Sequence, residues 1–266
     1  MGGAERSARR KRQAQLATQS KAVASARRSG PDAKIIITVV VVLLVAGAVI
    51  GGVLFSNAQK NKTEGQVIPA KSASLDYPVR RDGAVVVAGK DGAKVTVDIY
   101  EDFLCPFCRQ FEESNASAIE AKLKDGSIRV QYHLVTILND RSNPPGYSMD
   151  AANAGLCAAD GGHFPDFFAS LFGAQPEEGA RGYDKDQLAD LGTRLGITDP
   201  DFKTCVSTSR HSQEVQTAED QATALTYLQR DFGNGRKGFS TPTIALGQTL
   251  IDTTDPAWLD KLAASP

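Results

Sequence analysis

The chain has 266 residues, of which 41% are hydrophobic, and this composition supports an ordinary core and excludes a disordered protein. Residues 1–34 hold nine Lys and Arg against two acids, which leaves the remainder with 21 basic and 29 acidic side chains. Because the folded part is acidic by eight charges, nucleic-acid binding is disfavoured. Four cysteines are too few for a disulfide-dense small domain, but they suffice for one redox pair and one stabilising disulfide.

Residues 35–55 form an apolar run without charge or proline, which is long enough to cross a bilayer as a helix. The basic residues of 1–34 precede it, so the positive-inside rule predicts a single-pass protein of the cell membrane with a cytoplasmic N-terminus. The same basic side chains are expected to contact anionic membrane lipid. A cleaved secretory signal is the alternative, because residues 56–58 form a small-x-small site, but the apolar run is longer than such signals usually are. We expect an uncleaved anchor, a linker over 56–78 and an extracytoplasmic domain over 79–266.

The domain opens with short β-branched runs at residues 85–88 and 95–100, separated by a Gly-Lys-Asp-Gly turn, and this pattern predicts a hairpin. Residues 107–124 lack Gly and Pro and are predicted to be helical, and residues 128–137 form a β-rich segment. Strand, helix and strand in this order predict a βαβ unit with a right-handed crossover. Its reactive group is expected at the carboxyl end of the strand.

Helical periodicity dominates residues 140–232, so we expect an all-helical insert there. Strand character returns at 243–246 and 249–251 around a Gly-Gln turn. Residues 256–264 predict a closing helix with Asp255 as its N-cap. The predicted fold class is therefore α/β, with a helical subdomain inserted into the sheet domain.

The motif Cys105-Pro106-Phe107-Cys108 lies where the second strand gives way to the first helix. Pro106 suits the first helical turn, where no N–H donor is needed, so Cys105 is predicted to be the N-cap. The partial positive charge of a helix N-terminus favours the thiolate, and we expect a Cys105 pKa below about 8.5. Cys105 would then be the attacking sulfur, and Cys108, one turn later, the resolving thiol.

Half of a zinc site is the alternative interpretation of the CxxC motif. The chain has no second CxxC, and His133, His163 and His211 show no ligand spacing with one another, so we expect no metal. Dithiol exchange needs no organic cofactor either. A second element, Thr241-Pro242, enters the strand at 243–246, and the residues alone leave open whether its peptide bond is trans or cis.

The stretch Tyr-Glu-Asp-Phe-Leu-Cys-Pro-Phe-Cys at residues 100–108, with Gly-Phe-Ser-Thr-Pro-Thr at 238–243, resembles the thioredoxin-fold DsbA-type oxidoreductases. The resemblance covers residues from about 80 to 265, and the anchor and four cysteines are similar to the membrane-anchored actinobacterial form. It implies a thioredoxin fold, an extracytoplasmic dithiol oxidant and reoxidation by a quinone-linked membrane enzyme of the vitamin K epoxide reductase type. It also implies a cis bond before Pro242, with the main chain of Thr241 beside the sulfur to bind extended chains.

Two residues depart from the family pattern. Family oxidants often have histidine where this chain has Phe107, which offers no hydrogen-bond donor to the thiolate, so Pro106 and Phe107 would tune the Cys105 pKa only moderately. Thioredoxins carry a buried acid six residues before the first cysteine, and Ile99 stands there in this chain. Glu101 is a candidate substitute for proton transfer, and a solvated loop carboxylate is the alternative.

The remaining cysteines, Cys157 and Cys205, lie in helical segments of the insert. They could be free buried thiols or an electron relay, but an exported chain favours a structural disulfide between them. We therefore expect an oxidoreductase that introduces disulfides into folding exported polypeptides with free cysteines. The alternatives are a disulfide isomerase, a cytochrome-maturation type of reductase, and a binding module or chaperone for extended chains.

Overall fold

The structure is a computed structural model that describes four stretches of the chain, residues 44–45, 47–53, 60–72 and 76–264. The chain divides into two compact units, Met1–Asn57 and Ala58–Pro266. In the first unit the described residues are helical. The predicted cytoplasmic tail and most of the predicted anchor lie outside the described residues. Among the residues that are described, no helix is both long and apolar enough to cross a bilayer, so the anchor stays a prediction.

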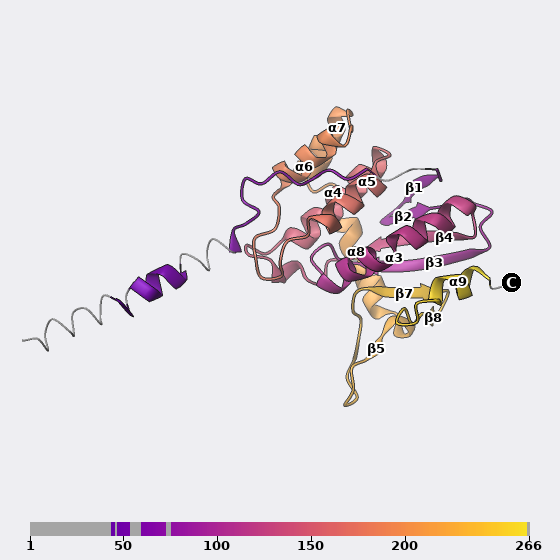
Figure 1. Ribbon diagram of the computed structural model, residues 1–266. Coiled ribbons are helices and arrows are strands. Elements are labelled where there is room, and N and C mark those ends of the chain that lie inside the picture. Colours follow the sequence, from indigo (N-terminus) through magenta and orange to yellow (C-terminus); the bar gives the residue numbers. More distant parts are fainter. Residues whose placement is uncertain (1–43, 46, 54–59, 73–75, 265–266) are drawn as a thin grey trace, which may run out of the picture. The chain divides into compact units, whose positions relative to one another are not determined.

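The second unit is built around a six-stranded mixed sheet (Figure 1). In spatial order its strands are β1 (Val79–Asp82), β2 (Val85–Ala88), β4 (Ile128–Leu134), β3 (Val95–Glu101), β7 (Thr243–Leu246) and β8 (Thr249–Leu250). β3 and β4 run parallel and are connected by α3 (Pro106–Asp125), which confirms the predicted βαβ unit. β7 pairs antiparallel with β3 on its other side, so β3 lies in the interior of the sheet.

The predicted hairpin between residues 85–88 and 95–100 is wrong. β2 pairs instead with β1, through a tight turn in which Gly83 has a φ of 59°. The second neighbour of β2 is β4, which lies between β2 and β3. Because α3 carries the chain from β3 to the adjacent parallel strand, β4 occupies the place beside β3 that the hairpin would have needed.

The helical subdomain follows β4. Its elements are η1 (Asn139–Arg141), α4 (Tyr147–Asp160), α5 (Phe164–Gly173), α6 (Lys185–Arg194), α7 (Pro200–Ser207), α8 (Ser212–Ala224) and η2 (Thr226–Leu228). α4 is its centre and contacts the four helices that follow it. Small residues make up much of the buried part of α4. A Cβ added at Gly155 would lie 3.0 Å from Leu134 Cδ1 and 3.4 Å from a ring carbon of Phe103, so this glycine lets β4 and the turn before α3 approach closely. The insert departs from the prediction at its end, where β5 (Arg230–Asp231) pairs with β6 (Lys237–Gly238).

The chain ends with the predicted β7–β8 hairpin and a short helix, α9 (Trp258–Ala263). The predicted N-cap is displaced, because Asp255 accepts a hydrogen bond from the N–H of Ala257 at 3.0 Å and thereby holds the turn before the helix. The N-cap position itself is Ala257. Trp258 packs against α3 through Phe111, with ring centroids 6.1 Å apart, so α9 covers the same face of the sheet as α3.

Part of the predicted linker packs against the helical subdomain. The Thr63 hydroxyl donates to the carbonyl of Arg181 at 2.8 Å, and the Gln187 side chain donates to the carbonyl of Thr63 at 2.7 Å. Further along, the Ile68 side chain is fully buried, and the Arg194 guanidinium donates to its carbonyl at 2.7 Å. Figure 1 shows this indigo segment running beside the helices of the insert. The described residues 60–72 therefore belong to the folded unit.

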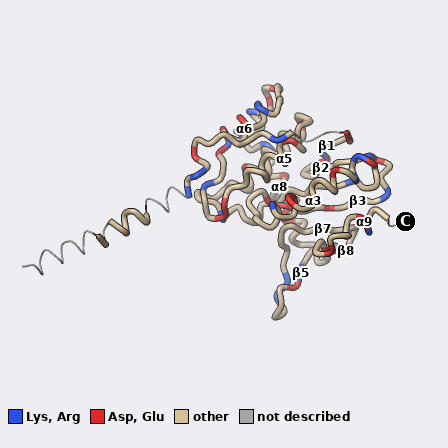
Figure 2. The backbone as a smooth tube through the Cα atoms, in the orientation of Figure 1, with Lys and Arg blue, Asp and Glu red and all other residues tan. Residues whose placement is uncertain are grey.

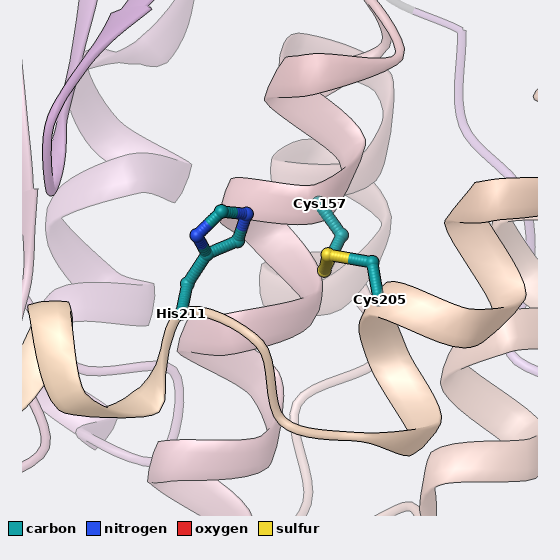
Figure 3. Close-up of side chains that lie close together, drawn as sticks. All are labelled: Cys157, Cys205 and His211. Atoms are coloured by element: carbon teal, nitrogen blue, oxygen red, sulfur yellow. A yellow bond between two sulfur atoms is a disulfide. The ribbon is translucent and has the colours of Figure 1, made fainter.

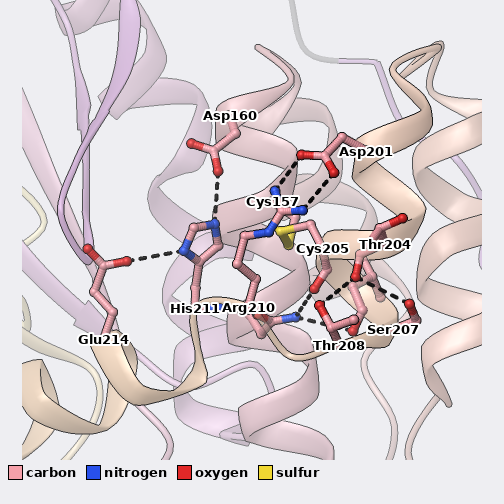
Figure 4. The surroundings of a disulfide bond; sticks show 12 residues. Cys157, Asp160, Asp201, Thr204, Cys205, Ser207, Thr208, Arg210, His211 and Glu214 are labelled. Carbon is pink, nitrogen blue, oxygen red and sulfur yellow. Dashed lines mark hydrogen bonds and ion pairs between the residues drawn. A yellow bond between two sulfur atoms is a disulfide. The ribbon is translucent and has the colours of Figure 1, made fainter.

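A disulfide joins Cys157 on α4 to Cys205 on α7, which confirms the predicted pairing over the free-thiol and relay alternatives. Beside it lies His211, which is 7% exposed (Figure 3). Its ring nitrogens lie 2.8 Å from Asp160 Oδ2 and 3.1 Å from Glu214 Oε2 (Figure 4). The disulfide and these polar contacts hold α4, α7 and the start of α8 together.

Replacing both Cys157 and Cys205 by Ala should destabilise the insert without removing the chemistry of the other two cysteines. The disulfide closes a loop with a sequence separation of 48, and loss of such a bond costs about 2–5 kcal/mol. Denaturant unfolding, followed by circular dichroism, measures this loss. An unfolding midpoint equal to that of the unsubstituted chain would contradict the structural role.

Candidate active site

The connection from β3 to α3 is a short turn organised by Asp102. Its carboxylate accepts hydrogen bonds from the N–H of Leu104 at 2.8 Å, the N–H of Leu138 at 2.8 Å and the hydroxyl of Ser148 at 2.6 Å. Burial raises the pKa of Asp102 to about 6, although these three hydrogen bonds oppose the rise. The local sequence does not indicate this role of Asp102, because its partners come from elements far apart in the chain.

Cys105 is the N-cap of α3, and Pro106 occupies the first turn as the motif predicts. The Cys105 pKa is lowered from 9.0 to about 6, chiefly by a hydrogen bond from the Cys108 thiol. Hydrogen bonds from the Thr241 side chain and the backbone N–H groups of Cys108 and Phe107 add to this effect, while burial opposes it. Figure 1 places this end of α3 at the edge of the sheet where β3 ends. The Cys108 thiol is therefore the main group that favours a thiolate at Cys105, and the N–H groups at the helix N-terminus add to its effect.

Cys108 lies one turn further along α3 and is fully buried. Its pKa is raised well above the ordinary value, first by burial and then by the hydrogen bond to Cys105 and the carboxyl of Glu101. Both cysteines are free thiols in this structure. The two sulfurs thus have opposite properties, since Cys105 ionises readily and Cys108 keeps its proton.

The loop before β7 lies directly beside Cys105. The Thr241–Pro242 peptide bond is cis, as the resemblance implies, and the Cys105 thiol donates to the carbonyl of Thr241 at 3.4 Å. The antiparallel pairing of Tyr100 with Thr243 places the start of β7 next to the end of β3. This register explains how two segments 136 residues apart in the chain come to share one site.

Glu101 is the last residue of β3 and is fully buried, so the interpretation as a solvated loop carboxylate is wrong. Its pKa is raised well above the ordinary value, first by burial and then by the nearby carboxyl of Glu112 and by Cys105. Among the described residues, no N–H or hydroxyl group donates a hydrogen bond to either carboxyl oxygen of Glu101. A hydrogen bond between the carboxyl groups of Glu101 and Glu112 forms only when one of them carries a proton. A protonated Glu101 beside Cys108 is thus the favoured state.

Glu112 completes this acidic pair, and sequence analysis missed it. It lies on α3 four residues after Cys108, so both side chains occur on one face of the helix. Burial raises the pKa of Glu112 to about 8. The helical spacing from Cys108 was the signal that could have identified it, but an acid in a helix is usually a solvated one.

A groove of about 520 Å³ opens beside the cysteines. Its lining comes from α3, the hairpin formed by β5 and β6, the cis-proline loop and the loop after β8, namely Phe107, Gln110, Phe111, Ser114, Asn115, Arg230, Phe232, Ser240, Thr241, Pro242, Thr253 and Thr254. The Phe107 side chain is 68% exposed, whereas Cys105 is 4% exposed. Residues of α3 and of the cis-proline loop, the two segments that meet at Cys105, thus line an open groove large enough for a peptide segment.

One group of described residues has ligand atoms close enough for a metal ion. These are Cys157, Cys205 and His211, whose ligand atoms lie within 4.8 Å of one another (Figure 3). The two sulfurs are bonded to each other and are therefore not thiolate ligands. His211 is also engaged by Asp160 and Glu214, so this cluster stabilises the insert.

Comparison with known proteins places this arrangement in a family. A family model described as thioredoxin matches residues 82–262. Among curated proteins, the serine/threonine-protein kinase PknE of Mycobacterium tuberculosis strain H37Rv is 31% identical over 195 residues, which cover 71% of this chain and 33% of that protein. The chain therefore spans about a third of the length of the curated relatives it matches.

Solved structures of thiol-disulfide oxidoreductases share the fold. MdbA of Corynebacterium diphtheriae has a TM-score of 0.59 and 20% identity, over 72% of this chain and 96% of that chain. MdbA of Corynebacterium matruchotii has a TM-score of 0.58 and 24% identity, over 71% and 93%. Oxidised DsbA of Mycobacterium tuberculosis has a TM-score of 0.53 and 23% identity, over 71% and 93%. These likenesses confirm the predicted DsbA-type thioredoxin fold.

The reactivity of Cys105 should depend on pH with a midpoint near 6, the lowered pKa of this thiol. Alkylation of the reduced protein by iodoacetamide measures it, because the thiolate reacts and the thiol does not. The reduced fold should also gain stability as pH rises above about 6 towards the ordinary thiol range, because the folded state releases this proton first. A midpoint near the ordinary value of 9.0 would contradict the stabilisation of the thiolate by the Cys108 thiol, Thr241 and the N–H groups of the first helical turn.

Glu101→Gln should stabilise the reduced protein at neutral and higher pH. The pKa of Glu101 is raised by burial, so the wild-type fold loses stability as pH rises above about 4.5, and the variant lacks that loss. Because the glutamine of the variant has no proton to lose, the free energy of unfolding at neutral pH should be higher in the variant by roughly 1–3 kcal/mol. Denaturant unfolding at several pH values measures the difference. Glu113→Gln, at a neighbouring exposed acid, is the control and should change little.

Proposed function

The chain belongs to the thioredoxin family whose model matches residues 82–262, and from that membership we propose that it is a thiol-disulfide oxidoreductase introducing disulfides into exported proteins. One observation carries the proposal. A stabilised thiolate at Cys105 caps α3 beside the Thr241 carbonyl, and a second thiol, Cys108, lies buried behind it. A low-pKa sulfur is a good leaving group, so a disulfide that contains it is reduced more readily than one between two ordinary thiols.

The exchange proceeds in two steps. A substrate thiolate attacks Cys105 Sγ in the oxidised protein, the Cys105–Cys108 bond breaks, and Cys108 leaves as a thiolate that accepts a proton. A second substrate thiolate then attacks the substrate sulfur of the mixed disulfide, and Cys105 leaves as a thiolate. The substrate loses two electrons in total and gains a disulfide, and the protein becomes the dithiol. No metal or organic cofactor takes part.

Glu101 is the proton donor that the first step needs. Its carboxyl group is buried close to both cysteines, and its raised pKa keeps it protonated at the start of the reaction. Because the Cys108 pKa is raised well above the ordinary value, a Cys108 thiolate takes a proton from Glu101 readily. Glu101 thereby does the work of the acid that thioredoxins carry six residues before the first cysteine.

The oxidising power should be moderate. Phe107 has no hydrogen-bond donor, so the Cys105 thiolate depends on the Cys108 thiol, the Thr241 side chain and two backbone N–H groups. Pro106 and Phe107 form the first turn of α3 and place no charge beside the Cys105 sulfur. A thiolate with fewer donors is a poorer leaving group than one with a cationic neighbour.

The cellular setting is part of the same proposal. The apolar run at 35–55 and the basic residues before it support a single-pass anchor with the catalytic unit outside the membrane and the basic tail against cytoplasmic lipid. Clients would be unfolded or folding exported polypeptides with free cysteines. A quinone-linked membrane enzyme of the vitamin K epoxide reductase type would reoxidise the dithiol. Nucleic acid has no role.

Two cysteine variants of the full-length chain test the function. Cys108→Ala is first loaded with glutathione as a mixed disulfide at Cys105, and it should then exchange glutathione for the thiol of a reduced, unfolded client protein with one cysteine. The covalent client complex should accumulate, because no Cys108 thiol is present to release it, whereas Cys105→Ser should form none. Non-reducing electrophoresis detects the complex. Client binding and cellular phenotype that survive Cys105→Ser would favour a chaperone. In intact cells, a mostly oxidised Cys105–Cys108 pair supports the oxidase, and a mostly reduced pair supports an isomerase or reductase.

A further inference from the structure

The hairpin formed by β5 and β6 stands out from the rest of the folded unit (Figure 1). The tight turn at its tip has positive φ angles at Gly233, Asn234 and Gly235, and the N–H of Phe232 donates to the carbonyl of Arg236 at 2.9 Å. This conformation leaves the Phe232 side chain 53% exposed. One exposed aromatic side chain is common on protein surfaces, so Phe232 becomes informative only together with other exposed apolar side chains near it.

This hairpin forms one wall of the groove beside the cysteines. Phe232 lies on that wall, Phe107 and Phe111 line the groove from α3, and the cis-proline loop with Thr241 lies between them. Phe107 and Phe232 are each more than half exposed, so the groove offers aromatic surface that no described residue covers. An aromatic side chain of a bound segment would be buried between two rings here.

Arg230 is the charged residue that lines the groove. One guanidinium nitrogen donates to the carbonyl of Pro242 at 3.1 Å, which fixes the head group against the cis-proline loop. Its Nε is buried without a hydrogen-bond partner among the described residues. The carboxylate of Asp252 is hydrogen-bonded by Thr254, and Arg230 acts on it only through its charge, as a minor cause of its lowered pKa. A buried donor without an acceptor is costly, and a carboxylate on a bound segment would satisfy it.

The rest of the hairpin adds positive charge around the groove. Arg236 and Lys237 lie near and on the second arm, and Asp231 on the first arm is the one acid among the hairpin residues (Figure 2). The hairpin therefore attracts negative charge towards a groove whose walls are aromatic. This complementarity distinguishes acidic segments from basic ones.

We propose that the hairpin Arg230–Gly238 selects the clients of this protein, favouring extended segments that carry an aromatic side chain and a carboxylate close to the reactive cysteine. The inference rests on the proposed function, because it concerns which polypeptides reach Cys105. Phe232 and Phe107 bind the aromatic side chain, Arg230 binds the carboxylate, and the main chain of the segment lies along Thr241.

Four short dithiol peptides of equal length test the inference with the full-length oxidised chain in detergent. They carry Phe or Ala at one position near the first cysteine and Glu or Gln at another. The two variable positions are placed either before or after the first cysteine. The placement that the wild-type chain oxidises faster is then used for all four peptides. Rates of Cys105–Cys108 reduction are measured by acid quenching and thiol alkylation.

The wild-type chain should oxidise the Phe/Glu peptide at least about tenfold faster than the Ala/Gln peptide, which corresponds to about 1.4 kcal/mol. In the Phe232→Ala variant, the ratio of the rates for the Phe and Ala peptides should fall towards one, while the ratio for the Glu and Gln peptides persists. In the Arg230→Gln variant, the Glu/Gln rate ratio should fall towards one and the Phe/Ala rate ratio should persist. Val67→Ala and Lys203→Gln change exposed side chains outside the groove, and both should keep the wild-type ratios.

Ratios between peptides separate selection from a folding defect, because misfolding lowers all four rates together. Equal rates for all four peptides with the wild-type chain would overturn the inference and leave the proposed function intact. Variants that slow every peptide by the same factor would also overturn it. If the wild-type chain oxidises no peptide, the proposed function itself fails and the inference falls with it.

Discussion

The interior position of β3 in the sheet is the constraint on which the rest of the site depends. β4 holds β3 on one side through parallel pairing and β7 holds it on the other, so the end of β3 and the start of β7 meet at one edge of the sheet. α3 begins at that edge, which places its N-cap, Cys105, against the carbonyl of Thr241. A different strand in the place of β7 would separate the Cys105 sulfur from the Thr241 carbonyl.

The same edge gives the two sulfurs different chemistry. Cys105 receives hydrogen bonds from its own helix start and ionises readily, whereas Cys108 lies in the core beside Glu101 and Glu112. Burying two carboxyl groups side by side is expensive unless they hold a proton between them. The proton that this pair retains lies next to the Cys108 thiol. The asymmetry of the dithiol thus comes from burial as much as from the helix N-terminus.

The sequence indicated the local chemistry better than the long-range pairing. The CPxC motif and its following helix predict the N-cap at Cys105, because both features are local. The predicted hairpin between β2 and β3 is wrong, because a short β-branched run predicts a strand but not the strand that pairs with it. The crossover through α3 places β4 next to β3 and thereby determines the pairing. Glu112 escaped notice because its burial depends on the packing of α3 against β4 and α5, which no local pattern reveals.

The connection between α5 and α6 links the docked segment 60–72 to the active site. On one side Lys62 pairs with Glu177 at 3.2 Å, and on the other the Gln175 side chain donates to the carbonyl of Cys105 at 3.0 Å. A single short connection therefore contacts both the residues that follow the predicted anchor and the N-cap of α3. An exposed ion pair alone contributes little, but the Gln175 hydrogen bond is partly buried and directional. The chain segment nearest the predicted membrane anchor thus helps to hold the reactive turn in place.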